Sequence, residues 1–194
     1  MPTAYLDMAA TTPVATRVAD VVLRFMTEDF GNAGSRTHEW GTVAKRAVGD
    51  ARATVAGVVS AAPDEVVFTS GATEANNIAL LGLANHGRTT GRRHILSSAT
   101  EHKAVLEPLE HLSAQGFDVE IMKPGSTGRY EADEVIARVR PDTLLVSLMH
   151  VNNETGVVQP VQELANHLLQ TPTYFHVDAA QSFAKVRIEE LRAP

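Results

Sequence analysis

The sequence of 194 residues contains no cysteine. This absence excludes disulfide bonds, thiolate-ligated zinc or iron–sulfur sites, and any cysteine nucleophile within these residues. Long apolar runs are missing too, since none approaches the roughly 20 residues that a membrane-spanning helix needs. The first residues also lack the basic and apolar regions of a secretion signal. We therefore expect a cytoplasmic protein that does not enter a membrane.

Charge of one sign is not concentrated anywhere in the chain. Lys and Arg together number 17 and Asp and Glu 23, which leaves a formal net charge of −6. The basic footprint of a nucleic-acid-binding protein is absent, so we expect a small-molecule substrate and no direct contact with nucleic acid. With 44% hydrophobic residues, the length suits one domain with a sizeable core, or part of a larger domain.

Hydrophobic periodicity predicts strands that alternate with helices. The expected helices cover residues 14–25, with Pro13 in the first turn, and then 40–59, 73–84, 104–112, 132–139 and 161–169. The expected strands cover residues 65–69, 94–97, 119–122, 143–149 and 174–177. This alternation predicts an α/β fold with a doubly wound, mostly parallel sheet and helices on both faces.

Ligands of such sheets bind beyond the carboxyl ends of the strands, so the residues that follow each strand are candidates for chemistry. The segment 70–74 follows the first expected strand and opens a helix. Backbone N–H groups at Ala72 and Thr73 and the helix dipole would face an anion there, and a phosphate is the natural occupant. The alternative is a simple capped helix start, with Glu74 favouring the dipole.

Asp178 ends the last apolar strand and precedes two alanines, which leave room for a ring to approach. A protonated pyridine nitrogen would be a suitable partner for its carboxylate and would keep the ring electron-withdrawing. The alternative is that Asp178 caps the next helix.

Three further polar groups follow strands. The imidazole of His102 could stack on an aromatic ring, or it could be polar surface. Asn152, Asn153 and Glu154 offer donors and acceptors that could hold a phenolic oxygen and a substrate carboxylate, or they could form a turn. Gln181 lies one helical turn beyond Asp178 and could reach the same ring edge, or it could be a surface amide. Together these groups predict a site for a phosphorylated pyridine ring.

Five segments carry a resemblance to a known family: residues 6–13, 68–77, 100–105, 149–156 and 176–182. They resemble the cysteine desulfurases of the nitrogenase and iron–sulfur-assembly type, within the class V aminotransferase-like, fold-type I enzymes that use pyridoxal phosphate. The resemblance covers the whole chain in order. It implies that residues 1–15 join a small domain and that residues 16–194 form the N-terminal part of the cofactor-binding large domain.

The resemblance also implies a role for each candidate residue. Ala72 and Thr73 would bind the cofactor phosphate, and Asp178 would hold the ring nitrogen. His102 would stack over the pyridine ring and take part in proton transfer on the substrate.

Two amide side chains complete the implied site. Asn153 and Gln181 would contact the phenolic-oxygen side, with Asn153 also near the substrate. Asn32 and the stretch 34–38 match a loop that lines the site in the family, although Ala33 stands where the family usually has proline.

The activity implied by the resemblance is removal of sulfur from L-cysteine, giving L-alanine and an enzyme persulfide for transfer to an acceptor protein. A homodimer is implied as well. The Schiff-base lysine and the nucleophilic cysteine are expected beyond Pro194, so the chain is expected to be a fragment with the cofactor cradle alone. Lys185 belongs to a separate stretch after Asp178 and is not expected to be that lysine.

Several alternatives to this interpretation stay open at the level of sequence. One is a related pyridoxal-phosphate enzyme, such as a selenocysteine lyase or an epimerase. Another is a naturally short, inactive interaction module. The acceptor of the sulfur is equally open among iron–sulfur scaffolds, tRNA thiolation and DNA phosphorothioation.

Overall fold

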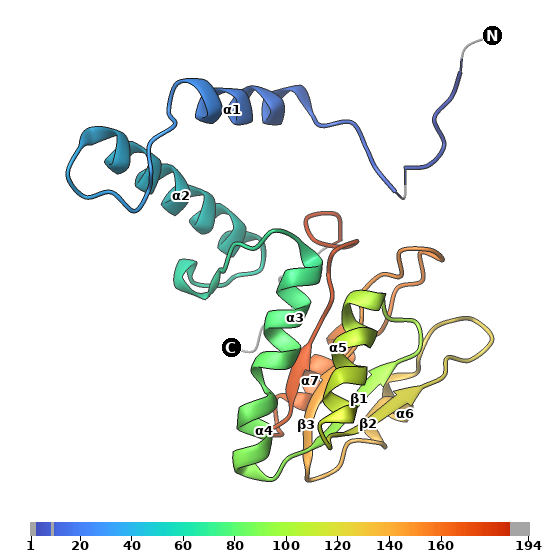
Figure 1. Ribbon diagram of the computed structural model, residues 1–194. Coiled ribbons are helices and arrows are strands. Elements are labelled where there is room, and N and C mark those ends of the chain that lie inside the picture. The colour runs from blue at the N-terminus through green and yellow to red at the C-terminus, as the bar shows by residue number, and fades with distance from the viewer. Residues whose placement is uncertain (1–2, 9, 187–194) are drawn as a thin grey trace. The chain divides into compact units, whose positions relative to one another are not determined.

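The computed structural model describes residues 3–8 and 10–186 of the chain (Figure 1). The chain divides into two units, Met1–Val66 and Val67–Pro194, called here the N-terminal unit and the sheet unit. In the described residues no helix is both long enough and apolar enough to cross a membrane.

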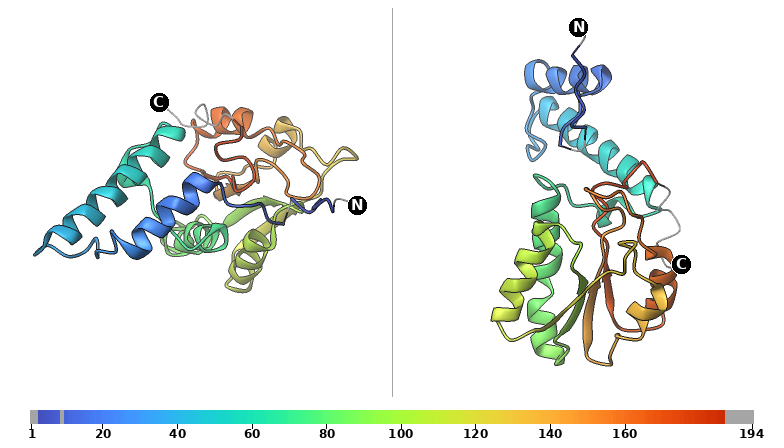
Figure 2. Two further views of the ribbon diagram at one scale, coloured as in Figure 1. Left: turned by 90° about the horizontal axis from the view of Figure 1, so that it is seen from above. Right: turned by 90° about the vertical axis from the view of Figure 1, so that its right-hand side faces the viewer.

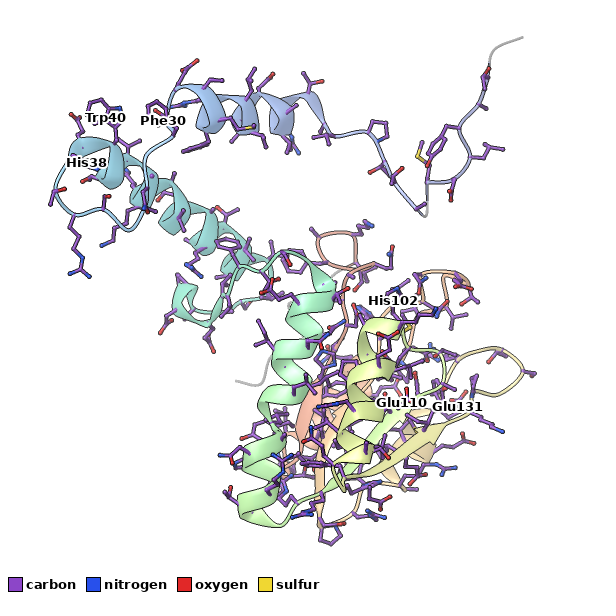
Figure 3. All side chains as sticks on the ribbon, in the orientation of Figure 1. Phe30, His38, Trp40, His102, Glu110 and Glu131 are labelled. Atoms are coloured by element: carbon purple, nitrogen blue, oxygen red, sulfur yellow. The ribbon has the colours of Figure 1, made fainter. Side chains whose placement is uncertain are left out.

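The N-terminal unit contains two helices, α1 (Thr16–Thr27) and α2 (Glu39–Val58), and a 3₁₀ turn, η1 (Pro63–Glu65). Both predicted helices are confirmed, but α1 begins three residues after Pro13, so the expectation that Pro13 lies in its first turn is wrong. His38 caps α2, because its Nδ1 accepts a hydrogen bond from the Gly41 amide at 3.1 Å. Figure 3 shows Phe30, His38 and Trp40 gathered near this cap.

The sheet unit is built on four parallel strands in the order β2-β1-β3-β4. The strands are β1 (His94–Ser98), β2 (Asp118–Met122), β3 (Thr143–Ser147) and β4 (Tyr174–His176). Helices α3 (Ala72–Gly82), α4 (Ala84–Thr90) and α5 (Lys103–Ala114) cover one face, and α6 (Ala132–Ile136) and α7 (Val161–Leu168) cover the other (Figures 1 and 2). The predicted doubly wound α/β fold is confirmed.

Alternating side chains of the strands form a separate core on each face of the sheet. Ile95 and Leu145 pack with apolar side chains of α3 and α5, including Leu80 and Leu109. Their sequence neighbours Leu96 and Val146 face the opposite way, against α6 and α7. A strand that is covered on both sides is buried at every position, which is why successive apolar residues run through β1 and β3 and why the polar residues at their ends are buried as well.

The structure corrects some of the predicted elements. Residues 65–69 form no strand, and Val67 and Phe68 are 71% and 49% exposed. An apolar run becomes a strand only beside another strand, and the four-stranded order of the described residues does not include this segment. The helix predicted at 73–84 is divided at Leu83 into α3 and α4, and β3 ends at Ser147 instead of Met149.

Candidate cofactor site

The loops that follow β1, β3 and β4 are joined by hydrogen bonds at the carboxyl edge of the sheet. The side-chain amide of Asn152 donates to the Thr100 carbonyl oxygen at 3.0 Å, which links the loops after β3 and β1. The His150 amide donates to the Asp178 carbonyl oxygen at 3.0 Å, which links the loops after β3 and β4. The strand-end segments that the sequence singled out therefore meet in one place.

Asp178 lies in this place and is only 8% exposed. Its Oδ2 accepts a hydrogen bond from the Asn76 amide nitrogen at 2.8 Å, and its Oδ1 accepts one from the Ala180 backbone at 2.9 Å. An ionised carboxylate accepts about four hydrogen bonds, so these two leave capacity for a further donor. The bond to Ala180 closes a local turn, and the residues described after Asp178 form turns and no helix, so the alternative that Asp178 caps a helix there is wrong.

Helix α3 connects Asp178 to the predicted phosphate site. Asn76 lies four residues beyond Ala72, which is about 6 Å along a helix axis. The first hydrogen bond of this helix runs from the Ala75 amide to the Gly71 carbonyl oxygen. The amides of Ala72 and Thr73 precede that bond and have no partner within the helix.

Space and charge at the start of α3 also suit an anion. A Cβ added at Gly71 would meet no atom within 4 Å in the described part of the chain. The Glu74 carboxylate accepts from the Ser70 amide at 2.6 Å, and this bond lowers the pKa of Glu74. The Glu74 carboxylate therefore bonds to the Ser70 amide, and the backbone amides of Ala72 and Thr73 stay available to an anion.

His102 occupies the N-cap of α5, where Figure 3 shows it at the beginning of the helix. Its Nδ1 accepts a hydrogen bond from the Ala104 amide at 3.1 Å. A neutral imidazole that accepts at Nδ1 carries its hydrogen on Nε2. The exposed ring is therefore held by the cap at one nitrogen, with Nε2 available to a ligand.

Asn153 and Gln181 are half-buried, and over residues 3–8 and 10–186 neither side chain has a hydrogen-bond partner. The adjacent Asn152 is committed to the loop, because its Oδ1 accepts from the backbone amides of Glu154 and Thr155 at 3.0 and 2.8 Å. The turn alternative therefore applies to Asn152, while Asn153 keeps both polar groups for a ligand.

Glu101 belongs to a singled-out segment, but its part in the site was not predicted. It is 6% exposed, and its Oε1 accepts from the Met149 amide at 2.7 Å and from the Ser98 hydroxyl at 3.0 Å. Burial raises the pKa of this carboxyl group to about 7. Glu101 thus ties the end of β1 to the end of β3, directly beside His102.

A second unpredicted group surrounds Asn76. The Asn76 Oδ1 lies 3.1 Å from His176 Nε2, and His176 Nδ1 lies 2.9 Å from the Ser147 hydroxyl oxygen. Burial lowers the pKa of His176. The feature of the sequence that could have indicated Asn76 is its position four residues after Ala72, which places both residues on one side of α3.

The donor set therefore fits a phosphorylated pyridine ring. One end of the site offers free helix amides for a phosphate, and the other offers a buried carboxylate for a ring nitrogen, held by Asn76 one turn further along α3. Asn32 and residues 34–38 belong to the N-terminal unit, and their predicted role in lining the site stays a prediction.

Comparison with known proteins agrees with the fold. The family model described as aminotransferase class-V matches residues 4–190, so the chain belongs to this family of pyridoxal-phosphate enzymes. Cysteine desulfurase IscS from Methylococcus capsulatus is 46% identical over 190 residues, which are 98% of this chain and 47% of the relative. The IscS of Pectobacterium carotovorum is 48% identical over 187 residues, 95% of this chain and 46% of the relative.

Solved structures show the same relationship. DndA from Streptomyces lividans is 65% identical, with a TM-score of 0.87, and the match covers 97% of this chain and 52% of that one. SspA in complex with cysteine is 38% identical, with a TM-score of 0.91, and the match covers 97% and 55% of the two chains. The chain thus spans about half the length of the relatives it matches.

Proposed function

We propose that this chain supplies the cofactor cradle of a pyridoxal-phosphate-dependent cysteine desulfurase, which converts L-cysteine to L-alanine and passes the sulfur to an acceptor protein. The observation that carries the proposal is the buried Asp178 carboxylate, held by Asn76 one helical turn from the free amides of α3. The names of the relatives support the choice of activity, and SspA was solved with cysteine bound. A cytoplasmic homodimer, with residues 1–15 in a small domain, is part of the proposal.

Each side chain has a distinct task in this proposal. The amides of Ala72 and Thr73 bind the phosphate, and Asp178 keeps the ring nitrogen protonated. When bound, the cofactor supplies an electron sink for the substrate carbon that loses its proton. His102 moves that proton at Nε2, because its Nδ1 is committed to the Ala104 amide.

The remaining polar groups orient the bound molecules. The amides of Asn153 and Gln181 hold the phenolic oxygen of the ring, and Asn153 also meets the substrate. The 194 residues contain no cysteine, so the thiolate that accepts the substrate sulfur is not among them.

The test is replacement of Asp178 by alanine in the complete enzyme. Loss of one charge-assisted hydrogen bond, about 1.5–3 kcal/mol, lowers the rate of alanine formation from L-cysteine by roughly one to two decades. Asp133→Ala is the matched control, because Asp133 is an exposed aspartate on α6. Alanine formation by Asp178→Ala at the rate of the control would contradict the proposal.

A further inference from the structure

Four side chains in the sheet unit form one continuous row of hydrogen bonds. The row runs from Ser147 at the end of β3 to His176 at the end of β4, then to Asn76 on α3 and finally to Asp178. Ser147 and His176 are direct partners across the parallel β3–β4 pair. The row therefore leads from the interior of the sheet to the carboxylate of the candidate site.

The chemistry of these groups allows one direction of donation. A carboxylate only accepts hydrogen bonds, so Asn76 must present its NH₂ group to Asp178 and its Oδ1 to His176. An amide oxygen also only accepts, so His176 must carry a hydrogen on Nε2. Its Nδ1 is then bare in the neutral ring and accepts from the Ser147 hydroxyl group.

Burial supports the neutral form of this ring. The Ser147 side chain is fully buried, and burial lowers the pKa of His176. The Asp178 carboxylate, whose Oδ2 accepts from the Asn76 amide, fixes the orientation of that amide, and the amide oxygen in turn fixes the Nε2–H tautomer of His176. The Ser147 hydroxyl group, which can donate or accept, anchors the ring by donating to Nδ1. Because the Ala180 amide holds Oδ1, both oxygens are held and the plane of the carboxylate is set.

We propose that Ser147, His176 and Asn76 are positioning residues, which orient the Asp178 carboxylate toward the ring nitrogen of the cofactor. This inference rests on the proposed function. Without the His176 ring, Asn76 Oδ1 loses its N–H donor, and without the Ser147 hydroxyl group the ring loses the hydrogen bond that anchors its Nδ1. The Asn76 side chain is then held less firmly, and the direction in which the Asp178 carboxylate faces is less well fixed.

The experiment compares two ligands that differ at one atom. Binding of pyridoxine 5′-phosphate, which has no aldehyde, is measured on the full chain beside the same phosphorylated ring with carbon in place of the ring nitrogen. The wild type should prefer the nitrogen-containing ring by about tenfold or more in Kd, the scale of a charge-assisted hydrogen bond. The preference should fall below about threefold in His176→Phe and decrease in Ser147→Ala.

Two substitutions serve as controls. His176→Gln can place an amide donor where Nε2 lies, so it should restore the preference that His176→Phe loses. His86→Phe replaces a half-buried histidine on α4 that makes an edge contact with Tyr174, and it should leave the preference unchanged. NMR of ¹⁵N-labelled histidine should show His176 as the Nε2–H tautomer in the wild type and in Ser147→Ala, because Asn76 Oδ1 accepts from Nε2 in both.

The outcomes separate this inference from the proposed function. Equal weakening of both ligands in His176→Phe and Ser147→Ala, with the preference intact, would show a purely structural role and overturn the inference alone. An Nδ1–H tautomer in the wild type would overturn it as well. If the wild type itself shows no preference for the nitrogen-containing ring, the assignment of Asp178 fails, and the proposed function fails with it.

Discussion

The two units of the chain use their apolar residues in different ways. In the N-terminal unit, α1 has no buried residue, and α2 buries only Gly41, Ala44 and Ala56. In the sheet unit, two clusters of fully buried side chains fill the space between the strands and the helices. Both units contain regular helices with apolar faces, but among residues 3–8 and 10–186 the clusters of buried apolar side chains lie in the sheet unit.

The difference teaches that periodicity and burial are separate properties. A 3.6-residue apolar repeat predicts a helix in either unit, while a covering layer decides whether the apolar face contributes to stability. The candidate site depends on the enclosed unit, because Asp178, Glu101 and Ser147 are all buried there. Substitutions of the same type in the two units should therefore have unequal effects.

The largest expected difference concerns two leucines. Leu145 on β3 is buried against the layer formed by α3 and α5, so Leu145→Ala should lower the free energy of unfolding by about 2–5 kcal/mol. Leu23 on α1 is 60% exposed, so Leu23→Ala should change it by less than about 0.5 kcal/mol. Urea denaturation of the 194-residue chain measures both values. A cost above about 1 kcal/mol for Leu23→Ala would mean that the apolar face of α1 is covered in solution.

A second prediction concerns pH and the buried Glu101. Because its folded-state pKa is raised to about 7, the folded chain holds this proton more tightly than the unfolded chain. The stabilisation is present below the ordinary carboxyl pKa and is lost as the pH rises through 7, which amounts to about 2–3 kcal/mol between pH 5 and pH 8. Glu101→Gln should abolish this loss.

Glu110 provides the matched control for this titration. It lies exposed on α5 (Figure 3), so Glu110→Gln should keep the pH dependence of the wild type. Denaturation curves across this pH range measure the difference. If the wild type and Glu101→Gln change in stability by the same amount from pH 5 to pH 8, the raised pKa of Glu101 is ruled out.

The third prediction compares two helical glycines. A Cβ at Gly87 on α4 would lie 2.7 Å from the Phe117 ring and 2.8 Å from Leu144 Cδ2, so Gly87→Ala should destabilise the chain by about 1–3 kcal/mol. Gly49 on α2 meets nothing within 4 Å in the described residues, so Gly49→Ala should stabilise by about 0.5–1 kcal/mol. Thermal denaturation of the two variants should shift Tm in opposite directions. Shifts of Tm in the same direction would contradict the difference in space around Gly87 and Gly49.

The smallest expected effects concern the two histidine caps. His38 caps α2 and His102 caps α5, so replacing either by alanine should cost about 1 kcal/mol. Asparagine is a good N-cap, and His102→Asn should recover stability without recovering alanine formation from L-cysteine in the complete enzyme. His38→Asn should likewise recover the stability that His38→Ala loses. Full activity of His102→Asn would show that the imidazole acts only as a cap.

The sequence alone predicted much of the fold because the signals are local. Apolar runs of four to seven residues located all four strands, and helical spacing located the helices that cover them. The polar residues after β1, β3 and β4 were also identifiable, since a parallel sheet brings its carboxyl ends to one edge. The roles of Ala72, Thr73, His102, Asn153, Asp178 and Gln181 remain predictions for the experiments above.

Only the tertiary structure decided which groups meet across the sheet. The bond between Asn76 and Asp178 joins residues 102 positions apart, and no local pattern indicates it. The raised pKa of Glu101 likewise depends on the layers that bury it, and whether residues 65–69 form a strand depends on whether another strand lies beside them. Periodicity and turn signals are properties of neighbouring residues, whereas burial and pairing arise when distant segments pack together, which is why the sequence determined the elements and the packing determined the site.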